Sequence, residues 1–287
     1  MQGAILLALV AGHLVGYGML RLYPARPPAS ALDRLMIVIL PAVVLLEWFG
    51  GLPRVSGKIL WLLRVAIAIV TGRILLHGSV YLSGPNPEWT TVETLGTLVV
   101  GAGVLIVVWS ALSWLFERSP GPAIPLALAM SIQSAAVCIM LAGYIKGGAA
   151  ALLATASLLG IIIAIAVLKQ FSALQPAISI GVVQLFGLLW IGRFFGGLTT
   201  GPALAIMLAP LLCLVSEIPV IRRQKPWIVG TLRLMLVAVP LVVVLWLAKQ
   251  KFDREMAPLL GQVSPTQIIR DTDAPTDARS QPTSQRM

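Results

Sequence analysis

Charged residues are scarce in this sequence. Asp, Glu, Lys and Arg together make up 11% of the chain and hydrophobic residues 58%, whereas an average soluble domain is about 25% charged and roughly 45–50% apolar. A chain with so few charges has too much apolar surface to remain in water. The composition therefore predicts an integral membrane protein and excludes an ordinary soluble domain.

Residues that usually carry catalysis or bind metals are also few. The two cysteines, Cys138 and Cys213, and the two histidines, His13 and His77, all fall in different apolar runs. Lone buried thiols act as small packing residues more often than as a disulfide or metal framework. The chain has no His-Glu-x-x-His, Gly-x-Ser-x-Gly or Gly-x-x-x-x-Gly-Lys-Ser/Thr motif. We therefore predict no cofactor and no metal site, and an intramembrane enzyme ranks third among the functions considered.

Long apolar runs fill most of the chain instead. Each is close to the roughly 20 residues that a helix needs to cross the hydrocarbon layer of a bilayer. Short segments rich in Pro, Gly and charge separate the runs, as breakers usually do. We predict about nine transmembrane helices, over residues 3–20, 35–50, 59–80, 94–116, 124–145, 149–169, 176–198, 202–221 and 228–248.

The predicted fold is an all-α polytopic helix bundle. The runs are continuously apolar, whereas the strands of a membrane β-barrel alternate over about ten residues. The first run has no basic segment before it and no small-x-small cleavage pattern after it, so it is interpreted as a helix rather than as a signal peptide. We place the bundle in residues 1–250. Residues 251–287 are polar and contain prolines, and we predict a disordered C-terminal tail.

The formal net charge of +10 comes mainly from basic residues in the short segments between runs. This pattern is typical of anchoring against anionic lipid headgroups, so the bilayer is the predicted partner, in a bacterial-type inner membrane. No basic stripe alternates with aromatic residues, which argues against nucleic-acid binding. Basic residues divide equally between the two sets of loops, so they do not decide the orientation. The acidic loop at Glu88 favours an inside N-terminus, and the basic flank after Leu247 favours an inside C-terminus.

The first three and the last three runs resemble one another. Each set has a Gly-containing first run, a Pro followed by Glu in the second, and an Arg early in the third. The matched residues are His13, Gly16, Pro41, Glu47 and Arg64 in one set, and Gln184, Gly187, Pro210, Glu217 and Arg233 in the other. This series predicts a three-helix repeat with both copies in the same orientation, as in many transporters. The alternative is chance, because apolar sequences align easily.

The matched charges form two candidate pairs, Glu47 with Arg64 and Glu217 with Arg233. In each hairpin the two residues lie equally far from the turn, so they are expected at the same depth, one to two turns below the interface. A lone charge there costs roughly 3 kcal/mol, and pairing removes much of that cost. Each pair is interpreted either as a structural clasp or as part of a solute or proton site.

Three further polar residues complete the candidate intramembrane site. Arg73 and His77 are spaced i, i+4 and share a helix face, and Arg193 lies in the seventh run. Intramembrane ionisable residues usually face the bundle interior or a water-filled cavity. The alternative is that these residues lie near the ends of their helices, close to solvent, and that the arginines reach the headgroups.

The function favoured by these patterns is that of a permease for a small solute or ion. The alternative is a non-catalytic membrane scaffold or subunit, which would contact a membrane-protein partner through small-residue faces. Gly12-x-x-x-Gly16 and Gly192-x-x-x-Gly196 are the segments that permit such close helix approach. Convergence of the polar residues on one central cavity would favour transport, and a dry core with exposed glycine faces would favour the scaffold.

Overall fold

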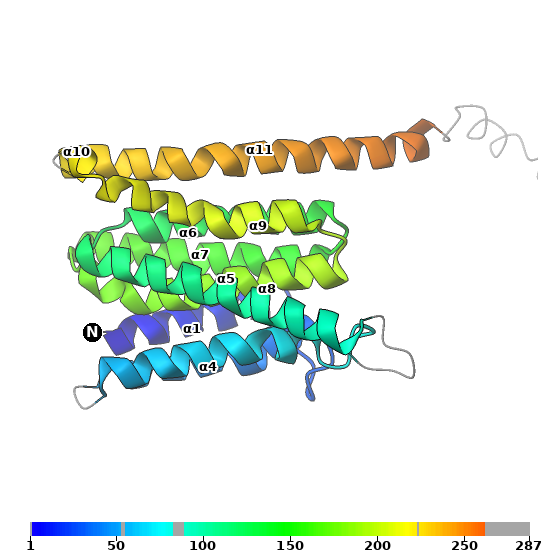
Figure 1. Ribbon diagram of the computed structural model, residues 1–287, viewed down its shortest axis with the longest axis horizontal. Helices are drawn as coiled ribbons and strands as arrows, with labels where there is room; N and C mark the ends of the chain where they lie inside the picture. The colour runs from blue at the N-terminus through cyan, green and yellow to red at the C-terminus, as the bar shows by residue number, and fades with distance from the viewer. Residues whose placement is uncertain (1, 53–54, 83–88, 223, 262–287) are drawn as a thin grey trace, which may run out of the picture. The chain divides into compact units, whose positions relative to one another are not determined.

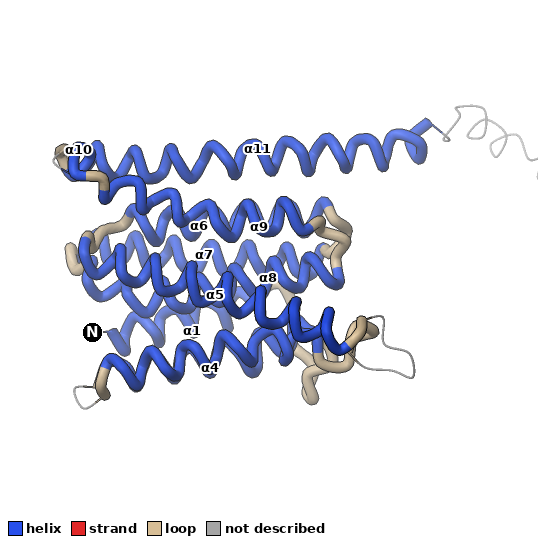
Figure 2. Tube along the Cα trace, in the orientation of Figure 1, coloured by secondary structure: helices blue, strands red, loops and turns tan. Residues whose placement is uncertain are grey.

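The computed structural model describes residues 2–52, 55–82, 89–222 and 224–261, and within these ranges it contains helices and no strands. The predicted all-helical fold is therefore confirmed for the described part of the chain. The chain divides into two units, Met1–Ala248 and Lys249–Met287. Figure 1 labels α1 and the helices from α4 to α11, and Figure 2 shows in tan the loops between helices.

The helices follow one another with short connections. In chain order they are α1 (Gln2–Met19), α2 (Ala31–Arg34), the π-helix η1 (Leu35–Ile39), α3 (Leu40–Gly50), α4 (Gly57–Leu76), α5 (Thr91–Arg118), α6 (Ala123–Leu141), α7 (Ile145–Leu168), the 3₁₀-helix η2 (Phe171–Leu174), α8 (Gln175–Phe195), α9 (Thr200–Leu208), the 3₁₀-helix η3 (Ala209–Glu217), α10 (Pro219–Arg222) and α11 (Pro226–Gly261).

Seven helices in the described residues are long and apolar enough to cross a membrane: α4, α5, α6, α7, α8, α9 together with η3, and α11. The prediction of about nine spans is therefore not confirmed. The predicted span 3–20 corresponds to α1, which is a shorter apolar helix. The predicted span 35–50 corresponds to η1 and α3, where π-helical geometry interrupts the α-helix before Pro41. Run length in a sequence does not report such interruptions.

Local signals explain several helix boundaries. Thr90 and Glu93 form a capping box at the start of α5, and Ser30 and Asp33 form another at the start of α2. The helix α4 ends at Leu76 because His77 leaves helical geometry, with ψ at 134°. The third predicted span, which continued to residue 80, was therefore too long at its end.

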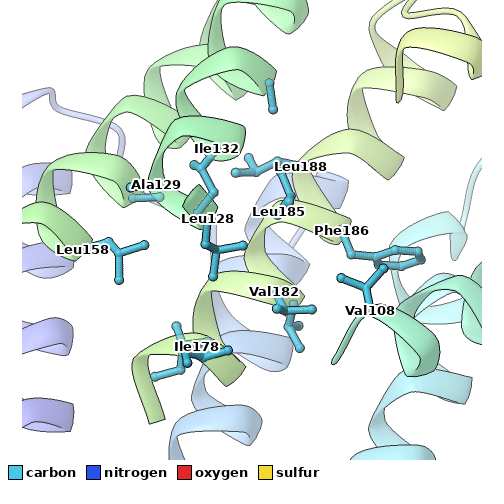
Figure 3. Close-up of a cluster of buried hydrophobic side chains, with 14 of the residues drawn as sticks. Val108, Leu128, Ala129, Ile132, Leu158, Ile178, Val182, Leu185, Phe186 and Leu188 are labelled. Atoms are coloured by element: carbon cyan, nitrogen blue, oxygen red, sulfur yellow. The ribbon is translucent and has the colours of Figure 1, made fainter. Parts of the chain in front are cut away.

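The core of the first unit is built around α8. Sixteen of its 21 residues are buried, and it contacts α1, α3, α4, α5, α6, α7 and α9. A helix that is apolar on all sides is expected to be surrounded by others. Figure 3 shows α8 side chains meeting those of α5, α6 and α7. Gly181 permits this approach, because a Cβ there would lie 2.4 Å from Cδ2 of Leu128.

The outer helices present apolar side chains to the surroundings. Only 22% of the apolar window of α11 is buried, compared with 78% for the segment that contains α8. Large exposed residues include Leu62 on α4, Val99 on α5 and Val239 on α11. Such surfaces fit a lipid environment, so the chain is a multi-pass membrane protein in contact with the bilayer.

The C-terminal unit begins inside α11. The helix continues through residues 251–261, where the sequence predicted the start of the disordered tail, and an ion pair between Lys251 and Glu255, 3.6 Å apart, bridges one turn. Pairs of this spacing stabilise a helix, so the helix extends beyond the apolar run. The rest of the predicted tail, 262–287, lies outside the described residues, as do the acidic loop residues 83–88.

The three-helix repeat is not confirmed. The predicted first copy would be α1, η1 with α3, and α4, and the predicted last copy would be α8, α9 with η3, and α11. The middle member contains a π-helix in one copy and ends in a 3₁₀-helix in the other. The third members have 20 and 36 residues. The charged residues that suggested the repeat do meet in pairs, as described next.

Candidate functional site

Glu47 of α3 and Arg64 of α4 form a close ion pair. Arg64 donates to Glu47 Oε1 from Nε at 3.0 Å and from Nη2 at 2.8 Å, and to Oε2 from Nη2 at 3.0 Å. Each side chain is only 4% exposed. The two residues that were expected to pair across the α3–α4 hairpin are therefore in direct contact. Charge-assisted contacts of this kind are short and strong, and they leave little net charge in the apolar interior.

Aromatic residues enclose this pair. The Arg64 guanidinium lies 5.0 Å from the ring centre of Trp61 and 5.6 Å from that of Trp109. Trp109 donates its indole N–H to Ser179 Oγ of α8 at 3.1 Å. Four helices therefore hold the pair in place. A cavity of about 510 Å³ between α1, α3 and η2 has Glu47 in its wall.

Glu217 at the end of η3 and Arg233 of α11 form a looser pair. The distance from Arg233 Nη2 to Glu217 Oε1 is 3.6 Å, and the Glu217 side chain is 17% exposed. Arg233 makes its short contacts with hydroxyl groups instead: Nε donates to Ser216 Oγ at 2.7 Å, and Nη1 donates to Ser119 Oγ at 3.2 Å. The second predicted pair is thus present, but its arginine is held mainly by neutral partners.

This looser pair lies in a cavity of about 590 Å³, which we call the arginine cavity. Its wall comes from the end of α5, the start of α6, the end of η3 and the start of α11. Its polar members are Arg118, Ser119, Ser216, Glu217, Gln224, Thr231 and Arg233. Arg118 lies over the ring of Trp114, 4.0 Å from its centre. Two arginines, one carboxylate and several hydroxyls therefore border one space at the end of the bundle.

The remaining predicted site residues do not join these pairs. Arg73 and His77 are exposed near the end of α4. The backbone carbonyl of His77 accepts a hydrogen bond from the guanidinium of Arg34, which also donates to the carbonyl of Leu75 at 3.4 Å. Arg193 is exposed in the last turn of α8 and donates from Nε to Thr200 Oγ1 at 2.7 Å. The seven predicted residues thus occupy several separate places.

His13 and Gln184 are buried and hydrogen-bonded to each other. His13 Nδ1 lies 2.9 Å from the carbonyl oxygen of Leu9, which can only accept, so a neutral ring donates from Nδ1. Its Nε2 then accepts from the Gln184 amide at 3.0 Å. These hydrogen bonds join α1 to α8. They favour a structural role for His13 and Gln184 over a role in lining a cavity.

Sequence reasoning missed a third cavity, between α5, α8 and α9. It has a volume of about 530 Å³, and we call it the aromatic cavity. Its wall consists of Trp89, Glu93, Gly96, Thr97, Val100, Gly101, Val104, Phe186, Leu189, Trp190, Arg193, Phe194, Thr200, Ala203, Leu204 and Met207. The sequence signal that could have revealed this cavity is the i, i+4, i+8 spacing of Phe186, Trp190 and Phe194, which puts three rings on one face of α8.

The rings of the aromatic cavity form a continuous row. Phe186 and Trp190 are 5.1 Å apart between ring centres, Trp190 and Phe194 are 4.9 Å apart, and Phe194 and Trp89 are 5.2 Å apart. Gly101 of α5 accommodates Trp190, because a Cβ at that position would lie 2.4 Å from the indole ring. The row is therefore fixed by packing before any ligand arrives.

No family model, no curated protein and no solved structure matches this chain. Its function is therefore inferred from the geometry of its own cavities and charges.

Proposed function

We propose that the protein is a membrane permease in which a solute moves along the seam between α5 and the α9–η3 segment. The observation that carries this proposal is the position of two cavities at opposite ends of that seam. The aromatic cavity begins at the first turn of α5 and reaches Met207 of α9. The arginine cavity lies at the last turn of α5 and at the end of η3. On α5 the aromatic cavity ends at Val104 and the arginine cavity begins at Arg118, so at ~1.5 Å per residue about 21 Å of helix separates them.

The segment η3 contacts α5, and along the chain it lies between Met207 of the aromatic cavity and Glu217 of the arginine cavity. In this proposal that contact closes the seam between the two cavities. The nine residues of η3 are 3₁₀-helical, whereas 3₁₀ runs longer than three or four residues are uncommon because their hydrogen bonds are poorer. Pro210 near its start removes one backbone donor. In this proposal η3 is the segment that rearranges when solute passes from one cavity to the other.

The two charge pairs then have different roles. Glu47 and Arg64 form a clasp of the α3–α4 hairpin, because aromatic rings and short hydrogen bonds occupy the guanidinium. Arg233 is the solute-contacting residue, because its neutral hydroxyl partners and distant carboxylate leave an anionic group of a solute able to compete. The proposed location remains a bacterial-type inner membrane.

The scaffold alternative receives less support. The small-residue segments that suggested a partner surface are used within the bundle: a Cβ at Gly16 would lie 2.7 Å from Leu153, and one at Gly192 would lie 2.7 Å from Ile139. An enzyme receives less still, because His13 is bonded to Gln184 and His77 is exposed, so neither approaches a described carboxylate as a catalytic partner.

Filling each cavity separately tests the proposed path. Ala203→Trp introduces a large ring into the aromatic cavity, and Gly230→Trp does the same in the arginine cavity, where a Cβ would be 3.9 Å from its nearest neighbour. Val239→Trp on the exposed face of α11 is the matched control. The measurement is uptake by proteoliposomes of two probes: glycine, followed by osmotic swelling, and a headgroup-labelled phospholipid, followed by dithionite protection.

We expect each cavity variant to reduce flux of the transported probe at least tenfold while Val239→Trp retains it. Flux that survives both cavity variants in folded protein would place the path elsewhere. Wild-type proteoliposomes with no flux of either probe above protein-free vesicles would contradict the permease itself.

A further inference from the structure

We infer that the aromatic cavity binds a zwitterionic phospholipid, with its headgroup at the Glu93–Arg193 end and one acyl chain between α5 and α9. This inference deepens the proposed function by naming the substrate class of the permease. Two observations support it. Charged and apolar residues are separated along the cavity, and one end has both a negative residue, Glu93, and a positive one, Arg193.

The charged and polar members of the cavity lie together. Glu93 is in the first turn of α5, Arg193 is in the last turn of α8, and Thr200 begins α9. Phe194 and Trp89 are in ring contact at the same end. Below this rim the wall is apolar apart from Thr97, and the last α5 residue in it is Val104, eleven residues after Glu93. At ~1.5 Å per residue the groove is about 16 Å long, which suits an extended chain rather than a compact solute.

The two charges are free to contact a ligand. Arg193 uses Nε for Thr200, and a guanidinium has five N–H donors in a fork that matches phosphate oxygens. Glu93 uses Oε2 to accept from the backbone N–H of Thr90 at 2.8 Å and from its hydroxyl at 2.9 Å. Its second carboxylate oxygen can accept from an ammonium group. Within the described residues, Glu93 and Arg193 do not neutralise each other as an ion pair.

A ligand with a single charge fits this rim less well. An anion drawn to Arg193 would meet the Glu93 carboxylate, and a cation drawn to Glu93 would meet the guanidinium, which already lies over the Phe194 ring at 5.3 Å. A phosphate and an ammonium on the same headgroup satisfy both. Trp89 and Tyr81, with ring centres 4.6 Å apart, add an aromatic surface of the type found at the membrane interface and able to face a cationic headgroup.

The experiment is a competition between two lipids that differ only in headgroup. Purified protein in a non-ionic detergent receives equal amounts of phosphatidylethanolamine and phosphatidylglycerol with identical chains, and retained lipid is counted by native mass spectrometry. We expect the wild type to retain phosphatidylethanolamine about tenfold more often, because two charge-assisted contacts are available to it.

Two conservative variants then remove one charge each. Arg193→Gln and Glu93→Gln should each bring the retention ratio close to one, and Gln at position 93 preserves the helix cap. Ala203→Trp should reduce retention of both lipids, since it fills the groove without changing charge. The matched control, Lys251→Gln with Glu255→Gln, removes an exposed ion pair outside the cavity and should leave the ratio unchanged. Thermal stability of every variant in the same detergent identifies misfolding.

Equal retention of the two lipids by the wild type would overturn the inference, and so would an unchanged ratio in both charge variants. Soluble glycerophosphoethanolamine at millimolar concentration should not displace the lipid, and displacement would show that the acyl chain is not bound. Selective retention without flux would leave the lipid site in place and contradict the permease. Flux of the glycine probe without selective lipid retention would support the permease and contradict the lipid site.

Discussion

The Glu47–Arg64 and Glu217–Arg233 ion pairs sit in similar hairpins and are built differently. Glu47 and Arg64 are 17 residues apart and make three short hydrogen bonds among aromatic rings. Glu217 and Arg233 are 16 residues apart, lie 3.6 Å from each other and border a cavity. Ser216 is the residue that lies 17 positions before Arg233, and it accepts the short hydrogen bond that Glu47 accepts in the other hairpin.

Helix geometry accounts for this exchange. A 3₁₀-helix turns about 120° per residue and an α-helix about 100°, so the eight steps from Ala209 to Glu217 change the direction of the last side chain by about 160°. Ser216 therefore faces Arg233, and Glu217 turns toward the cavity. The same residue types near the same turn thus give a close ion pair after an α-helix and a looser pair, with a partly exposed carboxylate beside a cavity, after a 3₁₀-helix.

The largest expected effect comes from breaking the closed pair. Arg64→Ala leaves the Glu47 carboxylate buried without its cation, and removal of one partner of a buried pair typically costs about 3–5 kcal/mol. We expect a large fall in the thermal unfolding temperature in detergent. Glu47→Gln combined with Arg64→Ala should recover much of the loss, because no lone charge remains. A double mutant as unstable as the single one would show that packing of the arginine, rather than charge, holds the hairpin.

Removing Arg233 from the looser pair should lower stability less than removing Arg64 does, but it should reduce flux more. Arg233→Ala removes hydrogen bonds to Ser216 and Ser119, but Glu217 is partly exposed and remains hydrated. We expect a loss of about 1–2 kcal/mol together with loss of flux in proteoliposomes. Arg233→Lys is the companion variant, because it keeps the charge and loses the planar fork. Normal flux in folded Arg233→Ala protein would show that Arg233 does not contact the solute and that both ion pairs have structural roles only.

A smaller effect is expected when the carboxylate of the open pair is neutralised. Glu217→Gln removes an attraction across 3.6 Å at a partly exposed position, where ion pairs contribute about 0–1 kcal/mol. The unfolding temperature should change little, whereas Glu47→Gln in the closed pair should lower it clearly. Equal shifts for the two substitutions would remove the distinction between clasp and open charge.

The smallest effect should come from a change remote from both pairs. Deleting residues 262–287 removes a polar segment that the sequence predicts to lack a packed core. Membrane insertion and unfolding temperature should stay within experimental error of the full chain. A marked loss of folded protein would show that this segment contributes to the stability against which the pairs are compared.

The charge pairs were predictable from sequence because an antiparallel hairpin fixes relative depth. The helical fold was predictable because hydrocarbon requires satisfied backbone hydrogen bonds. Hydropathy, however, measures exclusion from water, and lipid and protein interior exclude water alike. It therefore assigned the surrounded α8 and the peripheral α11 to one class. The 3₁₀ geometry of η3 depends on tertiary packing and on Pro210. The aromatic cavity depends on how the side chains of α5 and α9 pack against each other. The lengths of the apolar runs predict neither feature.

The closeness in sequence of Glu47 and Arg64 has a consequence for biogenesis. The helix α8, which later supplies Ser179 beside the pair, begins about a hundred residues after α4 ends, roughly 5–20 s later at usual rates of synthesis. During that interval the α3–α4 hairpin exists without its central neighbour. Because each charge finds its partner one short turn away, the hairpin can leave the insertion machinery as a nearly neutral unit. A mispaired hairpin would fail at this step, before the bundle exists, and would be visible as loss of membrane-integrated chain during synthesis rather than as a lower unfolding temperature.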